Sequence, residues 1–551
     1  MHDRFTRAPF NLDADAIAWI EATYDRLTTE QRIRQLFNLR IRSTDPADLE
    51  PIRAFAPGGI TRVPGKDVAA ERALIASLSA SAPVPMIVSG DLEGSRMSLE
   101  FGTEIPNPLA LAAVDDVQAT RRLLGIMAEE ARAAGMHWSF TPVLDINAAF
   151  RSAIVATRGF GRDVATIERH AVAQIEALQS NGIIACAKHW PGEGYDDRDQ
   201  HLVTTINPLA MDEWDATFGR LYRAAIDAGV LTIMSGHIAL PAFVRASDPD
   251  AGAEAFRPAS ISAALNVRLL RERLGFNGLI VSDSTSMAGL GSWSTRSEHL
   301  PEIIANGCDV ILFSTDPDRD DGYVRDAIAD GRISVARLEE AVKSVLALKA
   351  AAGLHKPQSI DASKANATTE KRAFAASVIR RAPTLVKDTQ NLLPIDPVQR
   401  KRVLVVTPGI IDPWRPQPIP FALPQMLEER GFAVTPYTPA VTVTRDAFDL
   451  VLYLFGEETL MTRGRISLDW LALHGNPGTA MRRPWHEVPT AMISFGYPYY
   501  LYDAPRVPTY INAYMTTETM QRAVVDALMG EIPFNTKSPV DPFVGLEDAR
   551  Y

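Results

Sequence analysis

The amino-acid sequence predicts an α/β protein with two domains, an N-terminal (β/α)8 TIM-type barrel followed by a smaller three-layer α/β sandwich. Two observations support this fold class. Short apolar runs alternate with long amphipathic stretches from about residue 30 to residue 350, and this rhythm stops before a second α/β region begins. The length of 551 residues also exceeds that of one ordinary domain.

Eight apolar runs are the predicted strands of the barrel. Strands that are buried on both faces read as continuous apolar runs, and repeated strand–helix units produce a parallel sheet. The segments between the runs, such as residues 116–135, have helical spacing and end in glycine. An open doubly wound sheet is the alternative. The runs cover residues 35–41, 57–60, 85–91, 137–145, 182–190, 230–238, 278–284 and 309–314.

Polar residues stand at the C-terminal ends of most of these runs. That pattern favours a barrel, because the active-site groups of barrel enzymes come from the ends of several strands at one rim. One such residue would carry no information, but a series of them indicates a shared site. They are Asp91, Asp145, Lys188, His189, His237 and Asp283.

A polar stretch separates the barrel from the second region. Residues 351–370 break the rhythm, and three further apolar runs follow them, at 402–408, 449–455 and 490–496. We therefore predict a barrel over residues 1–350, a linker over residues 351–370 and a C-terminal α/β sandwich over residues 371–551.

Composition excludes several classes of protein. The net charge of −11 argues against nucleic acid as a partner, because binding to phosphates needs a positive surface. The two cysteines, Cys186 and Cys308, lie in apolar runs, so a disulfide framework is not expected. The N-terminus lacks an apolar signal region, and no run of about 18 apolar residues could span a membrane. We therefore expect a cytoplasmic enzyme that does not bind membranes.

The densest polar segment runs from Lys188 to His201 and reads K-H-W-P-G-E-G-Y-D-D-R-D-Q-H. Gly192 and Gly194 allow a tight loop. Asp199 and His201 are two residues apart, so the carboxylate can hold one imidazole nitrogen and leave the other free to move a proton. A solvated, mixed-charge loop is one alternative. A metal site formed by Asp196, Asp199 and His201 is another, although Lys188 and Arg198 would crowd it with positive charge.

A second cluster, V-S-D-S-T-S-M over residues 281–287, follows a predicted strand. Asp283 is well placed as a nucleophile, because neighbouring hydroxyl groups keep a carboxylate ionised. The alternative is a cap of the helix that begins near Ser286. The pairing of Asp283 with an acid/base histidine on the same rim favours the first interpretation.

Together the two clusters resemble glycoside hydrolase family 3, in the branch typified by β-N-acetylglucosaminidases. That branch carries K-H-F-P-G-H-G, four further residues and D-S-H, and the spacing matches residues 188–201 throughout. The nucleophile motif S-D-x-x-x-M fits Ser282 to Met287. Other stretches that resemble the family are residues 91–96, 157–163, 235–242, 384–394 and 493–498, so that most of the chain is covered.

The resemblance implies a retaining mechanism on terminal β-linked sugars, most of all N-acetyl-β-D-glucosaminides. Asp283 would form a covalent glycosyl intermediate without participation of the acetamide, and His201, held by Asp199, would act first as acid and then as base. The two functional groups should approach within about 5–6 Å in a closed state. The residues expected to bind the sugar are Asp91, Arg96, Arg158, Lys188, His189 and Met287.

The sequence departs from the family pattern at four positions. Glu193 stands where the family has His, and Gln200 where it has Ser, while Trp190 and Ser95 replace Phe and Gly. Glu193 adds a negative charge beside the loop, so it affects the choice of substrate more than the mechanism. The exact sugar stays open.

Other functions remain as alternatives. They are β-glucosidase, β-xylosidase or phosphorylase activity on the same scaffold, an inactive sugar-binding protein and a metal-dependent hydrolase. We expect no cofactor and no metal, and a small carbohydrate as the substrate. A homodimer and the role of the C-terminal domain are left open.

Overall fold

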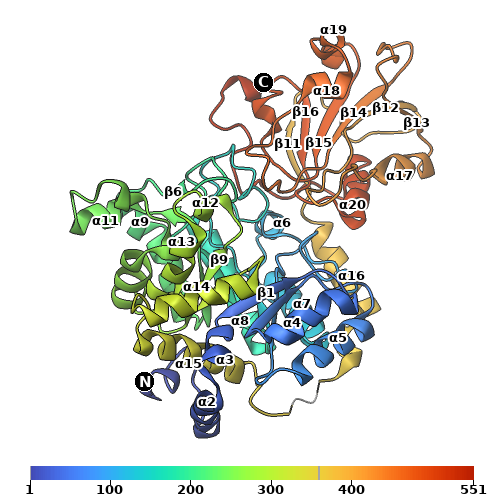
Figure 1. Cartoon of the computed structure of the whole chain (residues 1–551). Coiled ribbons are helices and arrows are strands. Elements are labelled where there is room, and N and C mark those ends of the chain that lie inside the picture. The colour runs from blue at the N-terminus through green and yellow to red at the C-terminus, as the bar shows by residue number, and fades with distance from the viewer. Residues whose placement is uncertain (1, 358–359) are drawn as a thin grey trace.

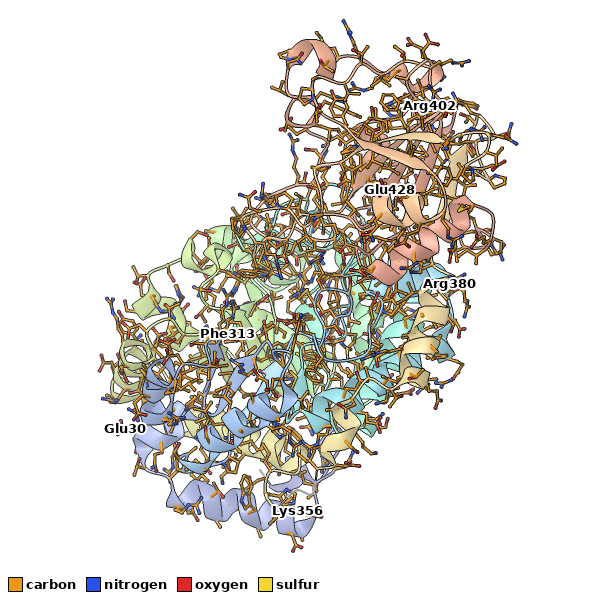
Figure 2. All side chains as sticks on the ribbon, turned by 90° about the vertical axis from the view of Figure 1, so that its right-hand side faces the viewer. Glu30, Phe313, Lys356, Arg380, Arg402 and Glu428 are labelled. Carbon is orange, nitrogen blue, oxygen red and sulfur yellow. The ribbon has the colours of Figure 1, made fainter. Side chains whose placement is uncertain are left out.

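The computed structural model describes residues 2–357 and 360–551, and it consists of two bodies that are each built around one sheet (Figure 1). The N-terminal body is the larger one, and the C-terminal body sits on one end of it. A view from the side shows the same arrangement, with Arg402 and Glu428 at the opposite end of the molecule from Glu30 and Lys356 (Figure 2). Among the described residues, no helix is long and apolar enough to cross a membrane.

The N-terminal sheet has eight strands in the order β4-β3-β2-β1-β10-β9-β7-β5, all parallel. Parallel bridges from Trp138 to Ile184 and from Val143 to Lys188 join the two outer strands and close the sheet into a barrel. Each strand overlaps one predicted run, so the barrel is confirmed. The strands are β1 (Phe37–Ile41), β2 (Gly59–Arg62), β3 (Ile87–Gly90), β4 (Trp138–Ser139), β5 (Cys186–Trp190), β7 (Thr232–Ser235), β9 (Leu279–Ser284) and β10 (Val310–Leu312).

Helices surround the barrel because their apolar faces pack against its strands. The helix over 117–133, for example, starts where the side chain of Asp116 accepts the amide of Ala119, and the chain then turns at Gly135 with a φ of +96°. The α-helices are α1 (His2–Phe5), α2 (Ala14–Arg26), α3 (Thr29–Arg34), α4 (Pro46–Phe55), α5 (Val68–Ala80), α6 (Pro108–Val114), α7 (Val117–Ala133), α8 (Val164–Ser180), α9 (Met211–Ala216), α10 (Phe218–Asp227), α11 (Pro241–Ser247), α12 (Ala288–Gly291), α13 (Arg296–Ala305), α14 (Pro317–Ala329) and α15 (Val335–Ala351). The smaller elements are the strand pair β6 (Thr205–Ile206) and β8 (Ile238–Ala239), the 3-10 helices η1 (Gly252–Phe256) and η2 (Ala259–Ile261), and the π-helix η3 (Ala264–Arg273).

The C-terminal sheet is mixed, with the order β11-β16-β15-β14-β12-β13 and only β11 antiparallel to its neighbour. β14 is buried along its whole length, so both faces of the sheet are covered. The strands are β11 (Thr384–Asp388), β12 (Arg402–Val406), β13 (Ala433–Pro436), β14 (Leu450–Phe455), β15 (Thr490–Ser494) and β16 (Thr509–Asn512). The helices are η4 (Ala362–Ala365), α16 (Thr369–Ile379), α17 (Leu423–Glu429), α18 (Trp470–His474), α19 (Pro477–Ala480), η5 (Pro484–His486), η6 (Tyr500–Tyr502), α20 (Glu518–Leu528) and η7 (Asp548–Arg550).

The predicted α/β domain after the barrel is thereby confirmed as a fold, and each of its three predicted runs contains a strand. Helix α16 joins the two bodies: Ala375 and Val378 pack in the core of the barrel, and Ile379 packs in the core of the second body. The domain boundaries at residues 350 and 370 stay a prediction.

Candidate active site

Asp283 lies near the end of β9, on the barrel rim, with 9% of its surface exposed. One carboxylate oxygen accepts the backbone amide of Ser284 at 2.7 Å. Burial acts to raise the pKa of Asp283, but the nearby rings of His189, His237 and His201 outweigh it and hold this pKa below its ordinary value. The site therefore contains a buried carboxylate that is ionised at neutral pH.

The helix cap that was the alternative role of Asp283 is not formed. The N-cap residue of α12 is Met287, and no side chain caps that helix. Met287 itself is buried, and its amide donates to the carbonyl of Ser284 at 3.1 Å. The carboxylate of Asp283 is thus left for chemistry at the rim.

The Asp199–His201 pair is formed, on the loop that follows β5. The Nδ1 atom of His201 lies 2.6 Å from Oδ1 of Asp199, and the same oxygen accepts the backbone amide of His201 at 2.8 Å. The His201 side chain is 22% exposed and that of Asp199 is 1% exposed. With Nδ1 engaged, Nε2 is the ring nitrogen that can exchange a proton with a ligand.

Elements far away in the chain hold this pair. The backbone amide of Thr462, in the C-terminal body, donates to Oδ2 of Asp199 at 2.8 Å, and the amide of Ala288 donates to the carbonyl of His201 at 3.0 Å. Burial acts to raise the pKa of Asp199, but the hydrogen bonds from His201 and Thr462 lower it below its usual value. Asp199 is therefore an ionised partner that fixes the ring.

A connected chain of charged groups, Asp91, Glu93, Lys188 and Arg158, forms a wall of the site. The Nζ atom of Lys188 lies 2.9 Å from Oδ1 of Asp91 and 2.6 Å from Oε1 of Glu93. Arg158 donates two hydrogen bonds to Glu93, at 2.8 and 2.9 Å, and it lies 3.4 Å from Nε2 of His189. Asp91, whose side chain is 41% exposed, is the open end of this wall and can accept sugar hydroxyl groups.

Mutual charge keeps the wall ionised despite its burial. Burial acts to raise the pKa of Glu93, but Arg158 and Lys188 hold it far below its usual range. Burial likewise acts to lower the pKa of Lys188, and the carboxylates of Asp91 and Glu93 raise it above the ordinary value. The wall is therefore a fixed array of charges, as positioning of a substrate requires.

A second buried network lies under the loop. His189 is held by Asp145, with Nδ1 to Oδ2 at 2.6 Å and the backbone amide to Oδ1 at 3.1 Å. The side-chain amide of Gln200 donates to Oε2 of Glu193 at 2.9 Å, and its oxygen accepts the amide of His237 at 2.9 Å. The two departures from the family motif in this loop thus bond to each other.

Glu193 is buried, and its second oxygen, Oε1, has no hydrogen-bond partner among the described residues. Burial raises its pKa well above the ordinary value, and the charges of Asp145 and Asp199 add to the effect. A neutral carboxyl group at this position satisfies Gln200 without adding charge to the loop.

Asp145, His189 and Glu193 are also the described residues whose ligand atoms lie within 4.8 Å of one another, as a metal would need. Nδ1 of His189 and both oxygens of Asp145 are already engaged in hydrogen bonds, so the group suits a hydrogen-bonded network. Asp196, of the metal site considered above, is instead paired with Arg198.

The structure places Arg96 apart from the other predicted sugar-binding residues. Its Nε donates to Thr516 at 2.7 Å, and it lies 3.5 Å from Asp412, both in the C-terminal body. By contrast, Asp91, Lys188, His189 and Arg158 form one connected array, as described above.

Sequence reasoning missed two residues that hold the site. Glu93 belongs to the same short motif as Asp91, so its carboxylate was a visible signal. Thr462 gave no signal, because a backbone amide bonds in the same way whatever the residue, and the contact joins residues 263 positions apart.

Comparisons with known proteins identify the family. The model of the glycosyl hydrolase family 3 N-terminal domain matches residues 28–348, more than half of the chain. A β-N-acetylglucosaminidase/β-glucosidase from Cellulomonas fimi is 39% identical over 563 residues, covering 99% of each chain. A β-hexosaminidase from Methylobacillus flagellatus is 31% identical over 45% of this chain and 70% of its own length.

Solved structures show the same architecture. The β-glucoside phosphorylase BglX superposes with a TM-score of 0.92 at 31% identity, over 100% of both chains. A family 3 β-N-acetylglucosaminidase from Paenibacillus sp. superposes with a TM-score of 0.80 at 24% identity, covering 94% of this chain and 100% of its own, which supports the fold. The chain therefore belongs to glycosyl hydrolase family 3 and is a β-glycosidase of that family.

Proposed function

We propose that the chain is a retaining enzyme that cleaves terminal N-acetyl-β-D-glucosaminides and β-glucosides through a covalent glycosyl–Asp283 intermediate. The observation that carries the proposal is the pairing of a buried, ionised Asp283 with the Asp199–His201 pair on one rim. The name of the Cellulomonas fimi relative, which covers both kinds of substrate, supports the choice of sugars.

In the proposed mechanism each group has one step. Asp283 attacks the anomeric carbon while His201 donates a proton to the departing oxygen, and neutral His201 then takes the proton of the attacking water. Asp199 holds the ring in one orientation through both steps. Asp91, Lys188, Arg158 and His189 bind the sugar hydroxyl groups, and Met287, four residues after Asp283, is proposed to contact the sugar.

Trapping of the intermediate tests the mechanism. A 2-deoxy-2-fluoro-β-glucoside with a good leaving group should label the protein once, on the peptide that contains Asp283, as peptide mass spectrometry would show. A label on another residue would overturn the assignment. A panel of p-nitrophenyl β-glycosides of N-acetylglucosamine, glucose and xylose then sets the sugar preference.

Phosphorolysis is the second candidate, and the likeness to a β-glucoside phosphorylase over the full chain favours it. A neutral histidine repels an approaching anion less than a carboxylate acid/base would. Phosphate in place of water as the acceptor would yield a sugar 1-phosphate, which product analysis with and without phosphate distinguishes from free sugar.

We also propose a cytoplasmic location. Cys186 and Cys308 are both buried and free, as is usual for proteins of a reducing compartment. Cell fractionation with an activity assay tests this, and activity confined to the medium would contradict it.

A further inference from the structure

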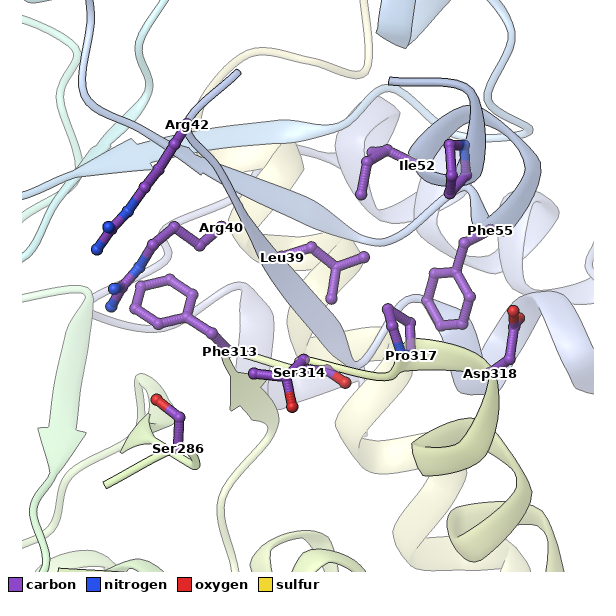
Figure 3. A pocket seen from close by; sticks show the side chains of 12 residues that line it. Leu39, Arg40, Arg42, Ile52, Phe55, Ser286, Phe313, Ser314, Pro317 and Asp318 are labelled. Carbon is purple, nitrogen blue, oxygen red and sulfur yellow. The ribbon is translucent and has the colours of Figure 1, made fainter. Parts of the chain in front are cut away.

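A cavity of about 500 Å³ opens at the barrel rim, where β1 and β10 end and close to the nucleophile (Figure 3). Arg40 and Arg42 lie side by side at one end of it, on the same side as Ser286. The apolar side chains of Ile52 and Phe55 lie at the other end. Asp91 and Asp283 lie near enough to Arg40 for their charges to act on its pKa, so the cationic end lies beside the proposed reacting centre.

Each guanidinium group lies over an aromatic ring, and no described carboxylate forms an ion pair with it. Arg40 stacks over Phe313 at 4.0 Å, and Arg42 stacks over Trp414 of the C-terminal body at 4.4 Å. Within residues 2–357 and 360–551, neither forms a hydrogen bond or an ion pair with another residue. The cation–π contacts hold the two side chains in place and leave their N–H groups free for a ligand.

The charges around this pair are unbalanced. Burial lowers the pKa of Arg40, Asp91 and Asp283 act to raise it, and Arg42 lowers it further, so the two arginines repel each other. The carboxylate of Asp318 also lines the cavity, but at its far end (Figure 3). Asp91 and Asp283 are near enough to act on Arg40 but form no ion pair with it, and two adjacent arginines without a bonded carboxylate in a cleft are typical of an anion site.

We propose that Arg40 and Arg42 bind an oxyanion on the acceptor side of Asp283. The anion is either inorganic phosphate or the carboxylate group of an acidic aglycone, which share the planar, bidentate recognition that arginine provides. This inference rests on the proposed function, since the acceptor side is defined by the glycosyl–Asp283 intermediate.

With phosphate the reaction balances without an added base. An oxygen of the phosphate dianion forms a bond to the anomeric carbon, the ester bond from that carbon to Asp283 breaks, and its electron pair returns to the carboxylate. The products are a sugar 1-phosphate monoanion and ionised Asp283. With an acidic aglycone, the arginines hold the carboxylate while His201 protonates the glycosidic oxygen.

Turnover of a p-nitrophenyl β-glycoside at increasing phosphate concentration tests the phosphate arm. We expect sugar 1-phosphate as a product, and a KM for phosphate that rises about tenfold or more in Arg40→Ala and in Arg42→Ala. Lysine at either position should restore part of the loss. Arg319→Ala is the matched control, since Arg319 lies over Tyr323 on the surface of α14 and should keep the wild-type KM.

A 4-carboxyphenyl β-glycoside compared with its 4-carbamoylphenyl analogue tests the other arm. If the carboxylate is the ligand, the preference for the acidic substrate falls about tenfold in Arg42→Ala, and phosphate has no effect. Calorimetric titration with phosphate and with benzoate measures anion binding directly and needs no turnover. It therefore tests the anion site even if no glycoside is cleaved and the proposed function fails. The site is overturned if neither anion binds and neither substitution changes acceptor preference.

Discussion

Two parts of the candidate active site are held in different ways. Three charged groups of the wall, Asp91, Glu93 and Lys188, lie on or just after barrel strands, Arg158 lies on the loop before α8, and ion pairs join all four to one another. The Asp199–His201 pair lies on a loop and depends on single hydrogen bonds from distant elements. The wall is thus held by its own ion pairs, and the Asp199–His201 pair by hydrogen bonds from residues outside its loop.

This difference has an energetic meaning. Removal of one partner from a buried ion pair leaves an uncompensated charge and costs about 3–5 kcal/mol. Loss of one hydrogen bond to a charged group costs about 1.5–3 kcal/mol. Changes to the wall should therefore disable or unfold the protein, whereas changes to the supports of the loop should tune its activity.

The largest effect is expected at the proposed nucleophile. Asp283→Asn removes the carboxylate that we propose to form the covalent intermediate, and it should lower kcat for aryl glycosides by about a thousandfold or more. Asp197→Asn, an exposed position on the loop after β5, should stay within about twofold of wild type. Wild-type rates in the Asp283 variant would favour a sugar-binding protein instead.

The next largest effect is expected in the free energy of unfolding, when a charge is removed from the wall. Lys188→Met leaves Asp91 and Glu93 without their shared cation and should cost about 3–5 kcal/mol in denaturant unfolding. The pKa of Glu93 in the folded protein lies below its ordinary value of 4.5. Ionised Glu93 therefore stabilises the fold above about pH 4.5, and this stabilisation is lost as the pH falls through the pKa of the folded protein. The difference in the free energy of unfolding between wild type and Lys188→Met should therefore become smaller below about pH 4.5.

Lys66→Met is the matched control, because the side chain of Lys66 is 78% exposed and its ion pair is with Glu100, which is exposed as well. It should change stability by less than about 0.5 kcal/mol. An equal loss in both lysine variants would show that the wall has no special energetic role.

Much of the fold was visible in the sequence, because a strand buried on both faces must be apolar throughout. All eight barrel strands fall on predicted runs, and the last residues of β5 and β9 carry the expected polar groups. Strands β11, β13 and β16 of the second sheet were not among the predicted runs. β13 is largely exposed at a sheet edge, so it lacks the apolar signal.

The site was predictable as a set of side chains but not as a network. Motif spacing marked Asp283, Asp199 and His201, since their chemistry depends on residue type. It did not reveal that Glu193 and Gln200 bond to each other, nor that Arg96 turns toward the C-terminal body. Such choices depend on which groups tertiary packing brings within reach, and no local pattern encodes them.

An intermediate effect is expected at Glu193, in the way that stability depends on pH. Glu193 has a raised pKa, so its stabilising contribution is full below the ordinary value of 4.5 and is lost as the pH rises toward the folded value. Glu193→Gln stays neutral at every pH and keeps an acceptor for Gln200. Its stability relative to wild type should therefore increase from pH 5 to pH 8, by about 1–3 kcal/mol at most.

Thermal unfolding across this pH range measures the effect. Glu50→Gln, whose parent side chain is 74% exposed, should show no such trend. A pH-independent difference in Glu193→Gln would mean that the carboxyl group is already ionised in the folded protein. The change should leave kcat with aryl glycosides within about tenfold of wild type, because Gln200 keeps its bond.

The smallest effect concerns the contact from the C-terminal body. Thr462 has a φ of +65°, a left-handed conformation that is unfavourable for a β-branched residue, yet its amide is the group that binds Asp199. Thr462→Gly keeps the amide and relieves the backbone, so it should retain kcat/KM within about twofold and gain up to about 1 kcal/mol of stability. Thr462→Pro lacks the N–H and cannot adopt the positive φ, so it should lose about tenfold or more in kcat/KM. If the glycine variant lost as much activity as the proline variant, the threonine side chain would be the group that matters, and the C-terminal body would not support the Asp199–His201 pair through its backbone.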